Sequence, residues 1–323
     1  MFNYASNKTI VKMQMTNNIL MIKPVGFRHN EQTAINNYYQ QVLDNITADN
    51  AQKKALLEFN NFVNILKKFG VNVIVIEDTK EFDTPDSIFP NNWVSFHSDG
   101  IVGLFPMCAK NRRNERRRDI LESLVNESNF HIKDIKNFTD FERDERYLEG
   151  TGSMVLDRQH KICYAAISIR TDKDLVIKFC NDFAYRPVLF TANQDVNGER
   201  MPIYHTNVMM CIADKFAVIC LDSIDDKDEK KLVIDTLIKT GKDIIEITQQ
   251  QKHRFAGNML QVMGNKPFLV MSRSAFNSLN NKQKIAIEKY NPIIHIPLDV
   301  IEACGGGSAR CMMAEVFLPK NLI

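Results

Sequence analysis

The stretch DKDLVIKFCNDFAYRPVLFTA, residues 172–192, decides the fold. Residues 172–183 begin with acidic side chains, which suit the positive end of a helix dipole. Residues 186–192 (RPVLFTA) follow as a short strand, and residues 207–224 (NVMMCIADKFAVICLDSI) then form a hairpin around the polar turn ADK. The predicted unit is therefore a helix, a strand, a loop and a hairpin.

Outward from this stretch, the same unit recurs. Further helices are predicted at residues 50–69, 116–128, 225–241 and 274–290, with Gly70 and Gly241 as stops and Ser272 or Ser274 as caps of the last. Strands follow them at residues 71–77, 131–138, 244–248 and 293–299. The other strand-like runs are 18–25, 100–107, 311–318 and the hairpins at 153–168 and 258–272.

A recurrence every 50–65 residues or so indicates a repeated supersecondary unit, and about five such units fit the chain. No Pro/Gly/Ser-rich linker interrupts them. We therefore predict one α/β domain over residues 18–323, preceded by a loosely ordered extension at residues 1–17.

The composition limits the class of protein. The chain has 323 residues, 41 Lys and Arg against 39 Asp and Glu, and a formal net charge of +2, which disfavours bulk attraction to nucleic acid or to an anionic membrane. No run approaches the ~20 apolar residues that span a bilayer, and the first residues do not read as a secretory signal. Seven cysteines without a CxxC pair argue against a disulfide framework or a structural zinc site, so a reduced, cytoplasmic protein is expected.

A cysteine near the end of the chain is the first candidate for chemistry. Three glycines, residues 305–307, precede Ser-Ala-Arg and then Cys311, which opens the apolar run 311–318. Consecutive glycines let the backbone approach a ligand closely, and a cysteine beyond them is placed to be a nucleophile. The alternative is a flexible turn followed by a buried structural cysteine.

A cysteine nucleophile needs a proton shuttle. His205 in IYHTNV stands at the mouth of an apolar strand, whereas His160 lies in a polar hairpin turn and His295 lies inside a short strand. His205 is thus the best candidate base, the alternative being a structural histidine at a strand end. Two acids also stand out: Glu149 before a Gly-Thr-Gly turn, and Asp86 in PDSIFPNNW.

Together these motifs resemble a known family. The strings PDSIFPNNW, LEGTGS, IYHTNV, FAGNML and GGGSARCMMAE, in this order, resemble the arginine deiminase and amidinotransferase (pentein) superfamily, and within it the citrulline-utilization hydrolase branch of the CtlX type. The resemblance covers residues 18–323. It implies a five-bladed α/β propeller with pseudo-fivefold repeats, in agreement with the count of about five units.

The resemblance also implies roles for single residues. Cys311 matches the nucleophile, His205 the general acid/base, and Glu149 the acid that binds substrate nitrogen hydrogens. Arg170 matches the arginine that pairs with the substrate α-carboxylate, which suits bidentate guanidinium geometry. Asp86 matches a polar residue at the amino-acid end of the substrate, where an acid can pair with an α-ammonium group.

Two positions depart from the deiminase pattern. Relatives place aspartates where this chain has Asn92 and Asn207, and those aspartates clamp a cationic guanidinium. Asparagine is neutral and offers both a donor and an acceptor, which fits a ureido group better. The expected substrate is therefore citrulline, bound by Asn92, Asn207, Asp86, Arg170, Phe89 and Gly307.

The expected reaction converts citrulline and water to ornithine, ammonia and carbon dioxide through a covalent cysteine intermediate, with no metal or cofactor and with a possible homo-oligomer. Either ammonia or ornithine can leave first. The alternatives are an enzyme acting on a guanidino substrate (a deiminase or an amidinotransferase) and a non-catalytic binding propeller. Arginines crowd residues 112–118 and are expected to be a solvated helix start, although Arg112 or Arg113 could instead close over the pocket.

Overall fold

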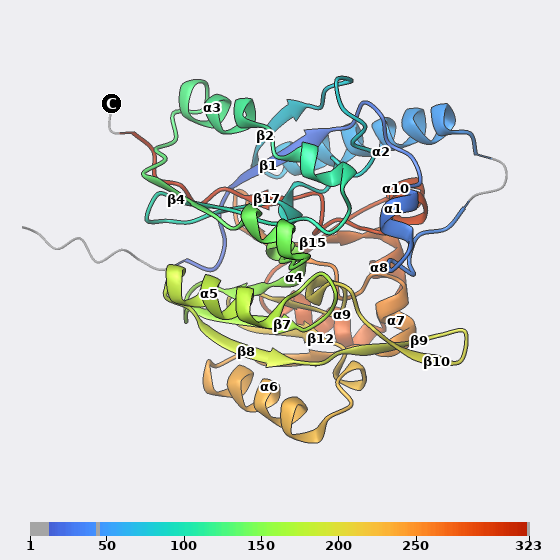
Figure 1. The fold of residues 1–323 in the computed structure, drawn as a ribbon. Coiled ribbons are helices and arrows are strands. Elements are labelled where there is room, and N and C mark those ends of the chain that lie inside the picture. Colours follow the sequence, from blue (N-terminus) through green and yellow to red (C-terminus); the bar gives the residue numbers. More distant parts are fainter. Residues whose placement is uncertain (1–12, 43–45, 322–323) are drawn as a thin grey trace, which may run out of the picture.

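The computed structural model describes residues 13–42 and 46–321. In this part of the chain, five three-stranded sheets share one plan (Figure 1). In every sheet the middle strand pairs antiparallel with one neighbour and parallel with the other. A helix precedes the parallel neighbour each time, because parallel strands need a long crossover connection. The predicted repeating unit is thus present.

Four sheets follow one another along the chain. Their strands are β3 (Val94–Phe96), β4 (Ile101–Leu104) and β5 (Asp134–Asn137); β6 (Val155–Asp157), β7 (Ile162–Ala166) and β8 (Arg186–Phe190); β11 (Met210–Ile212), β12 (Phe216–Ile219) and β13 (Asp243–Glu246); and β14 (Leu260–Met263), β15 (Pro267–Ser272) and β16 (Ile293–Ile296). The crossover helices are α3 (Arg118–Asn126), α5 (Lys173–Phe183), α6 (Lys227–Lys239), and the pair α8 (Arg273–Ser278) and α9 (Asn281–Glu288).

The fifth sheet joins the two ends of the described chain. Strand β1 (Asn18–Lys23) pairs in parallel with β2 (Asn72–Glu77), and antiparallel with the C-terminal β17 (Ala314–Glu315). Helix α2 (Ala48–Lys68) makes the crossover. The candidate nucleophile, close to the C-terminus in sequence, is thereby fixed beside a strand from the N-terminal region.

Helix α2 illustrates why the crossover segments are helical. Thr47 caps its first turn by accepting a hydrogen bond from the N–H of Asn50, and Gly70 follows its end with a φ of +85°. Its buried face repeats at helical spacing: Ala51, Ala55, Phe59, Phe62, Val63 and Leu66. Such an apolar stripe stabilises the helix by packing against the sheet. Helices α2, α3 and α6 accordingly lie at the periphery (Figure 1).

Four hydrophobic clusters connect neighbouring sheets. The largest packs the sheet of β7 against those of β12 and β15, through Tyr164, Val218 and Met271 among others. A second joins the β15 sheet to β1 and α2, a third joins β1 to the β3–β4 hairpin, and a fourth joins that hairpin's sheet to β6, β7 and α5. Each sheet is therefore packed against neighbouring sheets through apolar side chains.

The structure corrects two predicted elements and adds a third. The helix predicted at residues 274–290 is two helices, because Leu279 is extended (ψ of 137°) and Asn280 forms a capping box with Gln283 that starts α9. The strand predicted at 311–318 is reduced to β17, since Cys311 lies in a turn closed by its N–H donating to the Ser308 carbonyl (3.0 Å). A hairpin of β9 (Asn193–Val196) and β10 (Glu199–Pro202) was not predicted.

The remaining short elements are α1 (Glu31–Ala34), α4 (Gly150–Ser153), α7 (Gln249–His253), α10 (Asp299–Gly305) and the 3-10 turns η1 (Pro90–Asn92), η2 (Asn111–Glu115), η3 (Thr139–Asp144), η4 (Thr206–Val208) and η5 (Leu221–Ser223). The extension predicted at residues 1–17 lies mostly outside the described residues. Its last part is packed, because Gln14 and Met15 are buried and the Gln14 amide donates to the carbonyl of Leu156 (2.9 Å). In the described residues, no helix is long and apolar enough to cross a membrane.

Candidate active site

The candidate site lies where five short segments come together, each directly before the strand that pairs antiparallel with the middle strand of its sheet. They are η1 before β3, α4 before β6, η4 before β11, the turn 255–259 before β14 and the turn 308–313 before β17. These segments carry Asn92, Glu149, Asn207, Asn258 and Cys311. Both η1 and η4 pack against α4. The repeated unit thus brings one polar position from each sheet to a common centre.

Cys311 is buried, with 5% of its surface exposed, and its sulfur faces two amide groups. The Nδ2 atom of Asn258 lies 3.2 Å from Sγ, and Nδ2 of Asn207 lies 3.6 Å from it. An amide N–H beside sulfur stabilises a thiolate, which is the nucleophilic form. The site therefore supplies neutral donors, rather than carboxylates, next to the sulfur.

His205 and Glu149 form a buried pair. His205 Nε2 lies 2.7 Å from Glu149 Oε2, and the other carboxylate oxygen accepts the N–H of Cys108 at 2.9 Å. Since an ionised carboxylate only accepts, Nε2 carries the hydrogen and Nδ1 keeps its lone pair. A side chain at Gly152 would collide with Nδ1, so the missing side chain leaves this nitrogen accessible.

The charges of this pair have clear causes. Burial by itself raises the pKa of Glu149, but the neighbouring Arg170 and His205 outweigh burial and hold that pKa well below its usual range. Burial lowers the pKa of His205 to about 4, against the opposing influence of Glu149. At neutral pH the pair is therefore a carboxylate and a neutral imidazole, an arrangement that can accept a proton at Nδ1.

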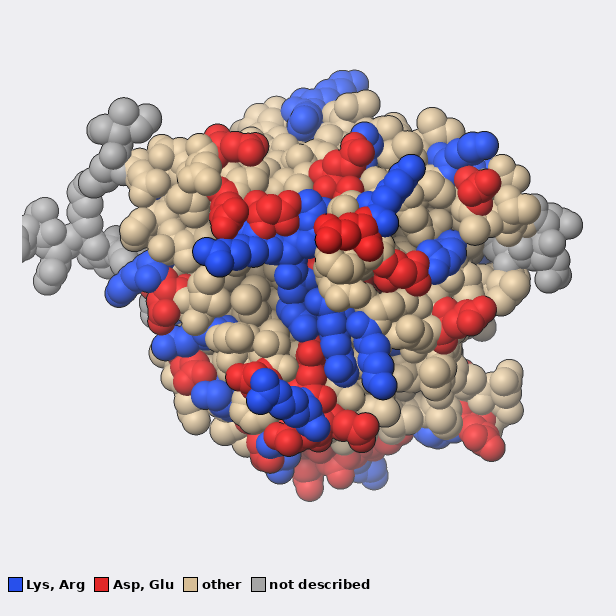
Figure 2. All heavy atoms as spheres, turned by 45° about the horizontal axis from the view of Figure 1, so that its top comes forward, with Lys and Arg blue, Asp and Glu red and all other residues tan. Residues whose placement is uncertain are grey.

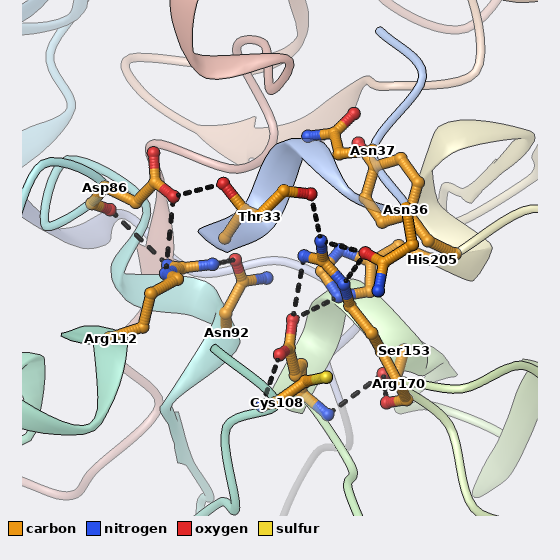
Figure 3. Close-up of polar contacts among 12 residues, drawn as sticks. Thr33, Asn36, Asn37, Asp86, Asn92, Cys108, Arg112, Ser153, Arg170 and His205 are labelled. Carbon is orange, nitrogen blue, oxygen red and sulfur yellow. Dashed lines mark hydrogen bonds and ion pairs between the residues drawn. The ribbon is translucent and has the colours of Figure 1, made fainter. Parts of the chain in front are cut away.

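Arg112 fixes the orientation of Asn92. Its NH1 donates to Asn92 Oδ1 at 2.8 Å (Figure 3). Its Nε and NH2 donate to the two oxygens of Glu115, both at 2.8 Å. A guanidinium has only donors, so the amide oxygen must face Arg112. The Nδ2 group of Asn92 then points away from it, is buried and has no hydrogen-bond partner among the described residues.

The far end of the pocket holds charged groups of both signs. Asp86 is buried, and its Oδ2 accepts from Asn30 (2.7 Å) and from the Thr33 hydroxyl (3.0 Å). Within residues 13–42 and 46–321, its Oδ1 has no hydrogen-bond partner. The Thr33 carbonyl accepts from Arg170 NH2 at 2.9 Å, so the α1 segment links the acid to the arginine (Figure 3). Arg170 also donates to Asn36 and is 3.4 Å from Glu149.

Phe89 and the glycine loop form one wall. Carbons of the Phe89 ring would lie 2.8–2.9 Å from any Cβ at Gly305 or Gly307, closer than such atoms can approach. Gly306 has a φ of +63°, a conformation that glycine adopts without strain. The triple glycine thus lets the backbone before Cys311 lie directly on the aromatic ring.

The structure brings the predicted site residues together. One narrow cavity, about 10 Å³ in volume, is lined by Asp86, Phe89, Asn92, Arg170, His205, Gly307 and Cys311. Glu149 and Asn207 stand behind it, in contact with His205 and with the sulfur. Of the two arginines left open, Arg112 lines the cavity, whereas Nε of Arg113 donates to the Met107 carbonyl (3.1 Å).

Sequence reasoning missed Asn258, and it did not predict that Arg170, which lines the cavity, also donates to Asn36 and to the Thr33 carbonyl. The signal for Asn258 was its position: it stands two residues before β14, just as Asn92 stands two before β3. Thr33 and Asn36 carried no such signal. Their contacts arise from a loop far away in the sequence.

Other polar residues have structural explanations. His160 contacts Asp157 at 3.0 Å, and the ring of His295 stacks on Phe276 with centroids 4.1 Å apart. No group of three or more His, Cys, Asp or Glu side chains that could hold a metal occurs in residues 13–42 and 46–321.

The arginines at residues 113–118, of which only Arg118 is fully exposed, are paired with acids. Arg116 contacts Glu142 at 2.6 Å, and Arg118 contacts Glu122 at 2.9 Å. Figure 2 shows basic side chains on this face bordered by many acidic ones. This arrangement is typical of a solvated surface.

Comparisons with known proteins agree with the geometry. The model of the family described as N,N dimethylarginine dimethylhydrolase, eukaryotic, matches residues 23–318. No curated protein matches the chain.

Several solved structures share the fold at low sequence identity. The substrate-bound N-terminal domain of a mutant of ArgZ, an arginine dihydrolase from cyanobacteria, has a TM-score of 0.70 and 18% identity, over 93% of this chain and 97% of that one. A mutant of AgrE with L-arginine gives 0.69 and 16%, over 93% of this chain and 40% of that one. A dimethylarginine dimethylaminohydrolase mutant, in an adduct with S-methyl-L-thiocitrulline, gives 0.62 and 14%, over 92% and 98%.

Proposed function

Because the chain belongs to the N,N-dimethylarginine dimethylhydrolase family of penteins, which are cysteine-dependent hydrolases of C–N bonds, we propose that it hydrolyses the ureido group of citrulline. The observation that carries this proposal is the pair of amides near Cys311. Asn92 has a buried, unpartnered Nδ2 donor, and Asn207 has a buried, unpartnered Oδ1 acceptor. A ureido group needs one donor for its oxygen and acceptors for its N–H groups.

A guanidinium fits this end of the cavity less well. It carries only donors, so the Asn92 NH₂, held in place by Arg112, would face another donor. Its positive charge would also lack a carboxylate partner at Asn92 and Asn207. Leaving a buried charge uncompensated costs about 3–5 kcal/mol.

The proposed first step is attack by the Cys311 thiolate on the ureido carbon. The ureido oxygen gains negative charge in the tetrahedral intermediate, and the Nδ2 donor of Asn92 stabilises it; one such donor is typically worth about 3–4 kcal/mol. His205 Nδ1 takes up the proton that Cys311 loses on forming the thiolate and gives it to the departing nitrogen. It then takes a proton from the water that cleaves the thioester-like bond.

Two orders of departure lead to the same products. If ammonia leaves first, ornithine stays attached as a thiocarbamate; if ornithine leaves first, a carbamoyl-cysteine remains. Both release ornithine, ammonia and carbon dioxide from citrulline and one water. Asp86 is proposed to bind the α-ammonium group, since its Oδ1 has no partner within the described chain, and Arg170 is proposed to bind the α-carboxylate after exchanging the Asn36 contact for it.

Arginine is the second candidate substrate. It is favoured by the structural neighbours, among them an arginine dihydrolase and a protein bound to L-arginine, and by the free carboxylate oxygen of Asp86 in the same cavity. Purified protein should therefore be incubated separately with citrulline, arginine and dimethylarginine, with ornithine, citrulline and ammonia measured.

Ornithine from citrulline, with none of the three products from arginine or dimethylarginine, is the expected result. Conversion of arginine to citrulline that then accumulates would refute the ureido proposal. The Cys311→Ala variant should be inactive on all three substrates, and retained turnover would exclude the covalent route.

We also propose that the five sheets are the blades of a five-bladed propeller, because each packs on the next through the four clusters. The same contacts support a single domain over residues 18–323. Placement in the CtlX-type branch and a cytoplasmic location remain proposals from the sequence.

A further inference from the structure

Asn258 contacts the reacting sulfur more closely than Asn207 does, and backbone groups bind both ends of its amide. Its Oδ1 accepts the backbone N–H of Arg310 at 3.0 Å, and its Nδ2 donates to the backbone carbonyl of Asn207 at 3.2 Å. A backbone N–H can only donate and a carbonyl can only accept, so the amide has one possible orientation. That orientation directs Nδ2 to Cys311 Sγ, 3.2 Å away.

The turn that carries Asn258 is built to hold it close. Phe255 has a φ of +62°, which is unusual for a residue with a side chain. Any Cβ at Gly257 would collide with the backbone at Val208 and Met209, so this turn lies directly against the segment that carries His205 and Asn207. Asn258 itself is only 1% exposed.

Among the described residues, the charged groups near Cys311 do not donate a hydrogen bond to its sulfur, as Asn258 does. The titratable side chains lining the cavity with Cys311 are Asp86, Arg112, Arg170, Tyr204 and His205. The hydroxyl of Tyr204 donates to the Gly306 carbonyl at 2.8 Å. The Arg310 guanidinium, although next in sequence, donates instead to the Met313 carbonyl (2.8 Å) and to Glu315 (2.8 Å).

We infer that Asn258 is a catalytic residue: its amide N–H stabilises the Cys311 thiolate and holds the sulfur in position for attack. This inference builds on the proposed covalent chemistry, but it does not depend on which substrate is used. The Asn258 amide also contacts both the backbone of Asn207, just before β11, and the sulfur of Cys311. It thereby keeps the distance between the nucleophile and the Asn207 side chain fixed.

Alkylation of Cys311 by iodoacetamide measures thiolate formation without turnover. The rate should be followed against pH by peptide mass spectrometry, with Cys311→Ala as the blank. Asn258→Asp has nearly the same shape and still accepts the Arg310 N–H, but it replaces the donor by a carboxylate. We expect its half-maximal alkylation to move up by about one pH unit or more, and turnover at pH 7 to fall by about 10²-fold.

Asn258→Ala should also raise the pH of half-maximal Cys311 alkylation, but by less than Asn258→Asp does, because it removes the donor without adding a charge. An unchanged alkylation profile in a folded Asn258→Asp variant would overturn the inference, even if turnover falls. If citrulline is not a substrate but the profile shifts, the proposed function fails while this inference stands.

Should both variants fail to fold, the native protein provides the test. The side-chain amide resonances of Asn258 in selectively labelled protein should titrate with the same midpoint as alkylation, and this titration should be absent in Cys311→Ala. Resonances that do not respond to pH in the native protein would overturn the inference.

Discussion

Replacing Asn207 by aspartate tests whether the uncharged amide beside the sulfur stabilises the Cys311 thiolate. The substitution preserves shape but puts a carboxylate where Nδ2 lies 3.6 Å from Sγ. With an effective dielectric constant of about 20, two unit charges at this distance repel by about 5 kcal/mol. Since each 1.36 kcal/mol is about a factor of ten, the thiolate population at neutral pH should fall by about 10³.

The assay is ornithine release from citrulline, measured at several pH values between about 6 and 10. Asn207→Asp should be about 10³ slower than wild type near pH 7 and should recover part of its rate at high pH, where the thiolate forms despite the repulsion. Asn207→Ala is the matched control: it also loses a donor, but its deficit should vary less with pH. An Asn207→Asp enzyme within about threefold of wild type at pH 7 would refute the reasoning.

Three further predictions concern the groups behind the cavity. Glu149→Gln should lower kcat by about 10² or more while leaving KM little changed, because the amide no longer fixes the hydrogen on His205 Nε2; steady-state kinetics with a wild-type kcat would contradict this. Arg112→Met should lower the free energy of unfolding by about 3–5 kcal/mol in urea titrations, since it leaves Glu115 buried without its partner. The double variant Arg112→Met, Glu115→Gln should recover most of that stability. Its turnover should still be slow, because the Asn92 amide can rotate without Arg112, and full activity would argue that Arg112 does not orient Asn92. Stability should also fall on acidification: below about pH 6.5 the unfolded chain protonates the imidazole while the folded His205, with a pKa of about 4, does not. Urea unfolding midpoints of wild type and His205→Gln, measured between about pH 4 and 7, test this prediction. If the midpoint changes with pH equally in both proteins, His205 is not the cause.

Much of the architecture could be predicted from local pattern. The crossover helices α2, α3, α5 and α6 appear where apolar spacing, acidic first turns and glycine stops indicated them, because these signals act within one element. The split after Leu279 was not predicted: Asn280 favours capping a new helix over continuing the old one, a competition that the apolar pattern does not report.

The sequence by itself determined the types of chemical group in the site and their order along the chain: a cysteine after three glycines, and a histidine, an acid and asparagines before strands. Residue types and their order can be read without knowing any distance in the folded protein. Only the tertiary structure decided which group faces which. Asn258 beside the sulfur, Arg112 setting the direction of the Asn92 amide, and Arg170 engaged with Asn36 are contacts between segments tens to more than a hundred residues apart. Hydrogen-bond direction depends on which donors and acceptors packing brings within about 3 Å, and no local pattern encodes that.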